Sequence, residues 1–431
     1  MSTIGPSDPF SIFRRVLDIS FLLLVGSLGF LQIHFHVFGF SLVTTDILFL
    51  ITALFWLANI LSRKAKVVWS PFYWCLFGYL AALFCSALFS INVSESFKRF
   101  LEETSLICLC ILAINVIDSV HRLKRALSAW LIGTSFAIVI GLTTIAFFYV
   151  NQDNPFLPYL TYHYGSVPVG NYPRITATFV SASMFCNYLN VSLIIALIAS
   201  VKRKFDERVS FVLIVGICTA SAFTFSIGLG GIFLAFAGWM YLSGSNSSLL
   251  RRSTMVLGAA AALFFLVISI FALTPYPNAE IWFRIPGTGL SLMPSARVLV
   301  WRDAIRTFID NPINGIGLEQ PVANVVFSNT EGSQSLLSDA HNTFLQVAAE
   351  SGILGFAAIL SILIFIMRRW WKKHLSSVTA NRLAFGLGLA FICGFIYQGL
   401  MGSFEHARHL WVLIGMFVAA DRLEINADQN S

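Results

Sequence analysis

The residues best suited to chemistry in this 431-residue chain are three arginines and one histidine in the polar stretch 295–355. They are Arg297, Arg302, Arg306 and His341. A guanidinium can hold a phosphate through two parallel hydrogen bonds, and a neutral imidazole can accept a proton from a hydroxyl. Long apolar runs flank this stretch, so its basic residues are expected at a membrane surface, where they suggest a site for an anionic, phosphate-bearing substrate.

A short helix is predicted to carry the arginines. It begins at Ser295, the expected N-cap, and ends near Asp310, because Asn311-Pro312 cannot continue it. At 100° per residue, one face of this helix is apolar and comprises Val298, Trp301, Ala304, Ile305 and Phe308.

Arg297 falls inside that apolar face, where an arginine needs an anionic partner. The partner is either a substrate phosphate or a structural carboxylate such as Asp303, Glu319 or Glu405. Arg302 and Arg306 lie one turn apart on the polar side, where two like charges mildly destabilise a helix unless an anion lies between them. The alternative for this pair is an ordinary solvated helix face.

His341 is predicted to open a membrane-spanning helix, with Ser338-Asp339 as the N-cap. A helix N-terminus favours a neutral imidazole, which makes His341 a candidate general base; the alternative is a histidine that only caps the helix. Ala348, Gly352 and Gly355 continue one stripe of small residues below His341. This stripe is expected to leave a groove for another helix or a lipid chain.

Other ionisable residues are expected near the same membrane surface. Arg174 precedes an apolar run and is either a substrate ligand or an anchor that reaches lipid headgroups. Glu350 is expected within the membrane, where it either makes a structural hydrogen bond or takes part in the chemistry. A compact cluster between the last two apolar runs, which could supply counter-ions or a second base, consists of Glu405, His406, Arg408 and His409.

The composition indicates a membrane protein. Apolar residues make up 57% of the chain and charged residues 11%, and the mean hydropathy is +0.78. Soluble domains carry about 25% charged residues, so we predict an all-α polytopic membrane fold. About twelve runs are apolar enough to span a bilayer. They are 16–33, 46–61, 70–91, 102–118, 126–150, 178–200, 210–225, 229–243, 254–274, 341–367, 383–401 and 409–421.

The distribution of Lys and Arg predicts the topology, because cytoplasmic loops retain positive charge. With twelve spans, most of the 28 Lys and Arg residues fall on one side, which is therefore cytoplasmic and holds both termini. The first run is then an uncleaved anchor. The net charge of +7 follows from this bias and indicates no nucleic-acid partner. The outer side keeps Lys98, Arg99, Arg174, Arg284, Arg297, Arg302, Arg306 and Arg408.

The chain divides into three predicted parts. Residues 1–274 hold nine spans and an outer loop near 151–177, residues 275–340 form a large outer loop with the helix near 295–310, and residues 341–431 hold three spans and a cytoplasmic tail. Function is expected in the long outer loops.

Several function classes lack support in the sequence. The seven cysteines all fall in predicted spans, form no CxxC pair and have no histidine at zinc-ligand spacing, so we interpret them as core residues and expect no metal site. The chain has no P-loop, no GxGxxG after a strand and no GxSxG, which argues against ATP-driven transport and serine hydrolysis.

Three sequence elements together resemble the O-antigen ligase and O-antigen polymerase superfamily. The most specific is His341-Asn342, followed by nine residues and then Gly352 and Gly355. The others are Ser295-Ala-Arg-Val-Leu-Val-Trp301 and Asn311-Pro-Ile-Asn-Gly-Ile-Gly317. The spacing from Arg306 to Gly317 and the segment around Arg174 are also similar to elements of the superfamily. The rest of the chain matches only in hydropathy and in the large outer loop before the tenth span.

This resemblance implies a GT-C-like helical membrane fold and a metal-independent, inverting glycosyltransferase that needs no cofactor. The donor would be a glycan linked to undecaprenyl pyrophosphate, bound among membrane lipids. By resemblance, His341 and Arg297 carry the catalytic roles. Further pyrophosphate ligands would be Arg174, Arg302, Arg306 and Arg284, supported by Asn342, Glu405 and Trp301. The chain departs from the superfamily at Ile227, where many members have an arginine, so that Arg174, Arg284 or Arg302 would have to compensate.

The most specific hypothesis is an O-antigen ligase of the bacterial inner membrane, which transfers the glycan to lipid A–core at a periplasmic active site in lipopolysaccharide biosynthesis. The alternative is a polymerase of O-antigen or exopolysaccharide, which joins carrier-linked repeats. A glycan flippase or exporter would instead need a basic central cavity with charges in spans of both halves. The charges gather at one outer face, which favours the enzyme.

Overall fold

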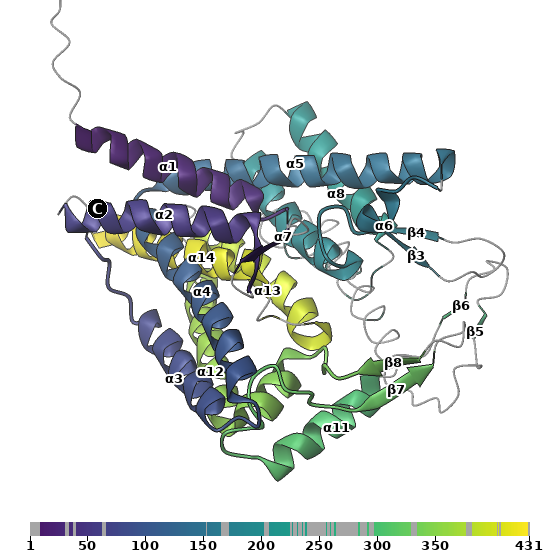
Figure 1. The fold of residues 1–431 in the computed structure, drawn as a ribbon. Helices are drawn as coiled ribbons and strands as arrows, with labels where there is room; N and C mark the ends of the chain where they lie inside the picture. The colour runs from purple at the N-terminus through teal and green to yellow at the C-terminus, as the bar shows by residue number, and fades with distance from the viewer. Residues whose placement is uncertain are drawn as a thin grey trace, which may run out of the picture.

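The part of the chain that the computed structural model describes is a bundle of α-helices with short two-stranded hairpins between them (Figure 1). The described residues are 9–30, 34–37, 40–62, 66–151, 153–164, 172–201, 207–224, 283–284, 291–292, 297–328, 334–375, 382–402 and 407–429, together with the single positions 226, 231, 235, 238, 256, 259, 263 and 404.

The helices follow the apolar runs closely. Their bounds are α1 Pro9–Ser27, α2 Thr44–Leu61, α3 Phe72–Leu88, α4 Val93–Val116, α5 Val120–Val150, α6 Leu157–Leu160, α7 Ala182–Val201, α8 Glu207–Phe223, α11 Arg297–Asp310, α12 Thr343–Leu375, α13 Arg382–Met401 and α14 Arg408–Gln429. Every predicted run overlaps one of these helices, except 229–243 and 254–274, which lie almost wholly outside the described residues. The count of twelve spans therefore stays a prediction.

A polytopic, mostly helical membrane protein is nevertheless what the structure describes. Among the described residues, five helical stretches are long and apolar enough to cross a bilayer. They are Thr44–Leu61, Val120–Val150, Ala182–Ala199, Thr343–Lys372 and Leu383–Leu400.

Four antiparallel hairpins, which the all-α prediction did not include, lie in the described loops. They pair β1 (His34–Val37) with β2 (Phe40–Val43), β3 (Thr161–Tyr164) with β4 (Tyr172–Ile175), β5 (Phe283–Arg284) with β6 (Ser291–Leu292), and β7 (Val325–Ser328) with β8 (Gln334–Leu337). In β3–β4, Tyr162 lies opposite Arg174, and in β7–β8, Val325 lies opposite Leu337.

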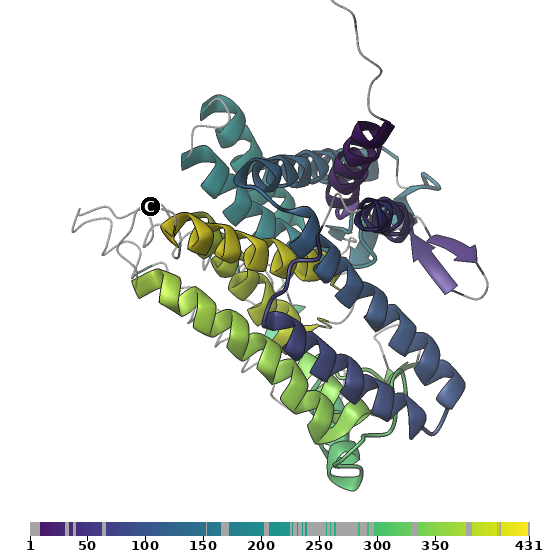
Figure 2. The ribbon, with the colours of Figure 1, turned by 90° about the vertical axis from the view of Figure 1, so that its left-hand side faces the viewer.

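The helices pack in pairs that are distant in sequence. Helix α12 packs along α3, α14 along α4, and α13 along α7 (Figure 2). Large buried side chains fill the space between helices, and a buried polar atom is most stable there when it has a hydrogen-bond partner. The ring of Trp130 stacks on Tyr188 at 5.5 Å, and its Nε1 donates to Ser192 Oγ at 2.8 Å. Of the cysteines, Cys110, Cys186 and Cys393 are core residues as predicted, whereas Cys108 is exposed on its helix.

Two ion pairs join segments that are distant in sequence. Arg122 pairs with Asp18 at 2.9 Å, and Arg369 with Asp421 at 3.6 Å; both arginines were predicted on the cytoplasmic side. In Figure 1 the start of α1 and the C-terminus lie at the left, whereas the hairpins β3–β4, β5–β6 and β7–β8 lie at the right. The start of α1 and the C-terminus are thus on the side opposite to these three hairpins.

Candidate functional site

The site begins where α11 meets the start of α12. Trp301 on α11 donates its Nε1 hydrogen to the backbone oxygen of Ala340 at 2.9 Å. Ala340 is buried and directly precedes His341. The arginine helix and the histidine, predicted from separate motifs, therefore lie next to each other in the fold.

His341 itself lies outside α12, which corrects the prediction that it opens the helix. The N-cap is Asn342, whose Oδ1 accepts from the amides of Phe344 at 3.0 Å and Leu345 at 3.2 Å. His341 has a φ of 46°, the left-handed conformation that histidine tolerates better than most residues. Asn342, predicted only as a supporting residue, thus has a defined structural task.

Asp339, predicted to be part of the N-cap, instead organises the turn around His341. Its Oδ1 accepts from the His341 amide at 2.6 Å and lies 3.6 Å from the Nδ1 of the imidazole. The imidazole is 53% exposed. A carboxylate on the Nδ1 side favours the tautomer with its proton on Nδ1, which leaves Nε2 free to accept a proton from a substrate.

The apolar face of α11 is shifted from its predicted position. Val300 and Ala304 are its buried residues, whereas Ile305, assigned to that face from the sequence, is 46% exposed. Arg297 is half-buried at the first position of the helix, about 6 Å along the axis from Trp301. That Arg297 lies on the packed side stays a prediction. The predicted cap, Ser295, lies outside the described residues.

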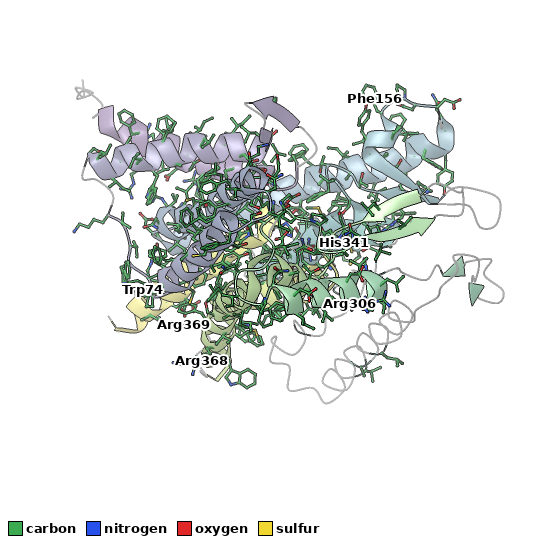
Figure 3. All side chains as sticks on the ribbon, turned by 60° about the horizontal axis from the view of Figure 1, so that its bottom comes forward. Trp74, Phe156, Arg306, His341, Arg368 and Arg369 are labelled. Atoms are coloured by element: carbon green, nitrogen blue, oxygen red, sulfur yellow. The ribbon has the colours of Figure 1, made fainter. Side chains whose placement is uncertain are left out.

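Arg302 and Arg306 are both exposed. The Nε of Arg302 lies 3.8 Å from the Oδ1 of Asp303, its chain neighbour, which is a weak contact. Figure 3 shows Arg306 and His341 at the same end of the molecule, and Trp74, Arg368 and Arg369 together at the other. Arg306 is therefore accessible to a ligand on the His341 side, and Arg302 lies one turn before it on the same helix.

Helix α12 is broken just below the site. Gly352 has φ 63° and ψ −160°, a conformation essentially restricted to glycine, and the amide of Ile353 donates to the Pro312 oxygen at 2.8 Å instead of to its own helix. The freed oxygens of Ala349 and Glu350 accept from the amides of Ile316 and Gly317, each at 3.0 Å.

We call the segment 311–317 the clasp, because its backbone forms hydrogen bonds on both sides of this break. A Cβ atom on Gly352 would overlap the Ile313 oxygen, and one on Gly315 would overlap the backbone of Glu350. The predicted stripe of small residues is therefore not an open groove for another helix or a lipid. At Gly352 the clasp already fills this space. The glycine-containing segment 311–317 therefore packs against the glycine of the break, Gly352.

A buried ionic cluster beside the clasp was missed from the sequence. Arg99 on α4 is 7% exposed and pairs with Glu103 at 2.7 Å, with Glu102 at 3.0 Å and with Glu319 at 3.6 Å. The signal was present: Glu102 and Glu103 fall in a predicted span, where acidic residues need a partner, and Arg99 lies one helical turn before them.

Glu350 belongs to the same region and makes structural hydrogen bonds, one of its two predicted roles. Its Oε1 accepts from the amide of Glu319 at 3.0 Å and from Gln346 Nε2 at 2.7 Å. A polar cavity of about 150 Å³ is lined by Arg99, Glu319, Asp339 and Glu350, among others. Carboxylates outnumber the single arginine among these residues, so a phosphate is not expected to bind in this cavity.

Arg174 lies on β4, and its Nε donates to the backbone oxygen of Thr224 at 2.9 Å. Thr224 follows α8 directly and lies three positions before Ile227 in sequence. The half-buried Arg174 therefore contacts a residue three positions before Ile227, the position at which the predicted resemblance implies an arginine in many members. Arg284 is on β5, but its side chain, like Ile227, lies outside the described residues.

The predicted ionisable cluster between the last two spans is divided by the fold. Arg408 forms a bidentate pair with Asp46 at the start of α2, at 2.8 and 2.9 Å. His409 is fully buried, with Nε2 2.7 Å from Asn187 Oδ1. Neither is placed to act as a counter-ion or a second base. Glu405 and His406 lie outside the described residues.

Replacing Arg408 by glutamine is expected to lower the free energy of unfolding by about 2–3 kcal/mol, because the partly buried Asp46 loses both charged hydrogen bonds. Thermal unfolding of the purified protein in detergent measures this loss. The double variant Asp46→Asn/Arg408→Gln should lose less than the sum of the single losses. A stable Arg408→Gln protein that transfers no glycan would instead support a counter-ion role.

These features define a class: a polytopic helical membrane protein in which an arginine-bearing helix packs against a broken membrane helix beside an exposed histidine. A comparison with protein families assigns the same region of the chain to a known family. Residues 181–360, which include α11, the clasp and His341, match the family model described as O-antigen ligase. The predicted resemblance to the O-antigen ligase superfamily is thereby confirmed.

Two relatives show how broad this similarity is. The chain is 22% identical over 365 residues to the teichuronic acid biosynthesis protein TuaE of Bacillus subtilis, covering 81% of this chain and 70% of the relative. It is 26% identical over 184 residues to the O-antigen ligase of Pseudomonas aeruginosa, covering 42% of this chain and 40% of the relative. The similarity therefore extends to proteins that serve different glycans.

Proposed function

We propose that this protein is an inverting glycosyltransferase of the bacterial inner membrane that takes its glycan from undecaprenyl pyrophosphate. In its most specific form it is an O-antigen ligase, and the acceptor is lipid A–core on the periplasmic side. The proposal is supported most directly by the hydrogen bond from Trp301 to Ala340, which holds the arginine helix against the histidine turn.

The proposed reaction needs one base and a set of cations. Nε2 of His341 accepts the proton of the acceptor hydroxyl as that oxygen attacks the anomeric carbon of the donor sugar. The bond from this carbon to the pyrophosphate oxygen breaks with inversion, and the lipid pyrophosphate leaves with the electron pair. Arginine guanidinium groups bind the leaving group and stabilise its developing charge, so that no metal is required.

The arginines differ in how the proposal uses them. Arg297 is half-buried beside Trp301 and is the leading candidate to contact the pyrophosphate. The exposed pair Arg302 and Arg306 would bind the pyrophosphate oxygens that face away from Arg297. Arg174, which reaches Thr224, would substitute for the arginine missing at Ile227, with Arg284 as a further ligand.

A polymerase remains the second candidate, because TuaE, whose name assigns it to teichuronic acid biosynthesis, matches 81% of this chain. Donor chemistry would be the same, and only the acceptor would change to a carrier-linked repeat. A flippase or exporter has less support, since it uses neither the exposed imidazole nor an acceptor base.

The test is an electrophoretic profile of lipopolysaccharide from a strain that lacks this gene, together with a probe of the carrier-linked pool. A ligase predicts core without repeats and long glycan left on the carrier. Core with a single repeat would assign the polymerase. An unchanged profile would contradict both O-antigen roles and direct the search to another surface glycan, with complementation by the intact gene as the control.

A further inference from the structure

Two buried side chains connect α12 to the turn that carries His341. Gln346 and Glu350 lie one turn apart on the helix, and each is 8% exposed. Gln346 Nε2 donates to Glu350 Oε1 at 2.7 Å, and Gln346 Oε1 accepts from the amide of Ala340 at 2.9 Å. The chain of contacts thus runs from Glu350 through Gln346 to the residue that precedes His341.

Ala340 is consequently held at both of its backbone polar groups. Its amide donates to Gln346, and its oxygen accepts from Trp301 Nε1. On the other side of His341, Asn342 caps the helix, and its Nδ2 donates to the Leu400 oxygen at 3.3 Å. His341 therefore has its left-handed conformation imposed by fixed neighbours.

The two side chains suit these positions chemically. Position 350 accepts two hydrogen bonds on one oxygen, from Gln346 and from the Glu319 amide, which an ionised carboxylate does well. Position 346 must accept from one neighbour and donate to another, which an amide side chain does. Neither group reaches solvent freely, so losing one partner leaves a buried polar atom unpaired.

We infer that Gln346 and Glu350 are positioning residues that fix the imidazole of His341 for proton transfer. This inference rests on the proposed function, in which His341 is the base. Neither residue touches the substrate. Both act through the Ala340 amide, so their loss should affect the chemical step more than donor binding.

The first part of the test is kinetic. In proteoliposomes with carrier-linked glycan extracted from the deletion strain, Gln346→Leu is expected to lower kcat about 10²-fold with a donor KM changed by less than about threefold. Glu350→Leu should act alike, and the double variant should be little worse than either single one, because both remove one chain of contacts. Glu350→Gln, which can still accept both bonds, should lose much less.

The second part does not depend on activity. Hydrogen exchange of the peptide 338–342, read by mass spectrometry, should be faster in Gln346→Leu and in Glu350→Leu. Glu424→Leu is the matched control, since Glu424 Oε1 accepts from the Ala384 amide at 3.1 Å, far in sequence from this turn. It should change neither the exchange nor kcat.

The outcomes separate the two ideas. Unchanged exchange in Gln346→Leu, a wild-type kcat in that variant or additive losses in the double variant would each overturn the positioning role. A wild-type protein that transfers no glycan would overturn the proposed function, and with it the catalytic part of this inference. Faster exchange confined to 338–342 together with a lower kcat supports both.

Discussion

Replacement of His341 by asparagine is expected to lower the rate of glycan transfer by about 10² to 10⁴-fold, the usual contribution of a general base. Asparagine is the most informative substitution, because it adopts the left-handed conformation of this turn readily and cannot accept a proton at neutral pH. The fold should remain intact, since the imidazole is 53% exposed. The turnover of carrier-linked glycan in proteoliposomes measures the effect.

His121 provides the matched control. It is exposed at the start of α5, on the predicted cytoplasmic side, so His121→Asn should transfer glycan at the wild-type rate. His341→Ala should lose as much activity as His341→Asn. If His341→Asn turns over at the wild-type rate while unfolding at the wild-type temperature, His341 is not the base.

Replacement of Gly352 by alanine is expected to destabilise the protein by about 3 kcal/mol or more. Alanine cannot adopt the backbone conformation at this break without strain, and its Cβ would overlap the Ile313 oxygen. The clasp must then move, and the hydrogen bonds of Ile353, Ile316 and Gly317 weaken with it. Thermal unfolding in detergent and the yield of folded protein measure the loss.

Gly78→Ala is the control for this substitution. Gly78 lies in α3, and nothing lies within 4 Å of the position that a Cβ would take. Alanine there should be neutral or stabilise the helix by up to about 1 kcal/mol. A Gly352→Ala protein as stable as Gly78→Ala would contradict the clasp geometry.

The helices could be predicted from the sequence because their signal is local. Length and apolar character fix a membrane helix without knowledge of its neighbours, which is why α5 and α13 match their predicted runs. The end of α11 at Asp310 was predicted for the same reason, since a proline two residues later acts on its own chain. The hairpins were not predicted, because strands of two to four residues are too short for a periodic pattern.

The candidate site was predicted as a set of residues but not as an arrangement. A glycine in an apolar run is compatible both with close helix packing and with a break in the backbone, and only the distant clasp decides for Gly352. In the same way, Asp339 and Asn342 both suit a helix cap, and the choice between them depends on the turn that Trp301 and Gln346 hold. The Arg99 cluster has a local signal, because Glu102 and Glu103 fall in a predicted span, where acidic residues need a cationic partner.

The clasp also limits how the protein can be recombined with its relatives. Because the clasp supplies backbone hydrogen bonds that the interrupted α12 cannot make for itself, the clasp and this helix must match each other in sequence. A chimera that exchanges only the loop before α12 would combine the clasp of one protein with the broken helix of another. The backbone hydrogen bonds between them would then be lost or weakened. Exchange of specificity between such proteins should therefore succeed only when residues 297–353 are transplanted as one block.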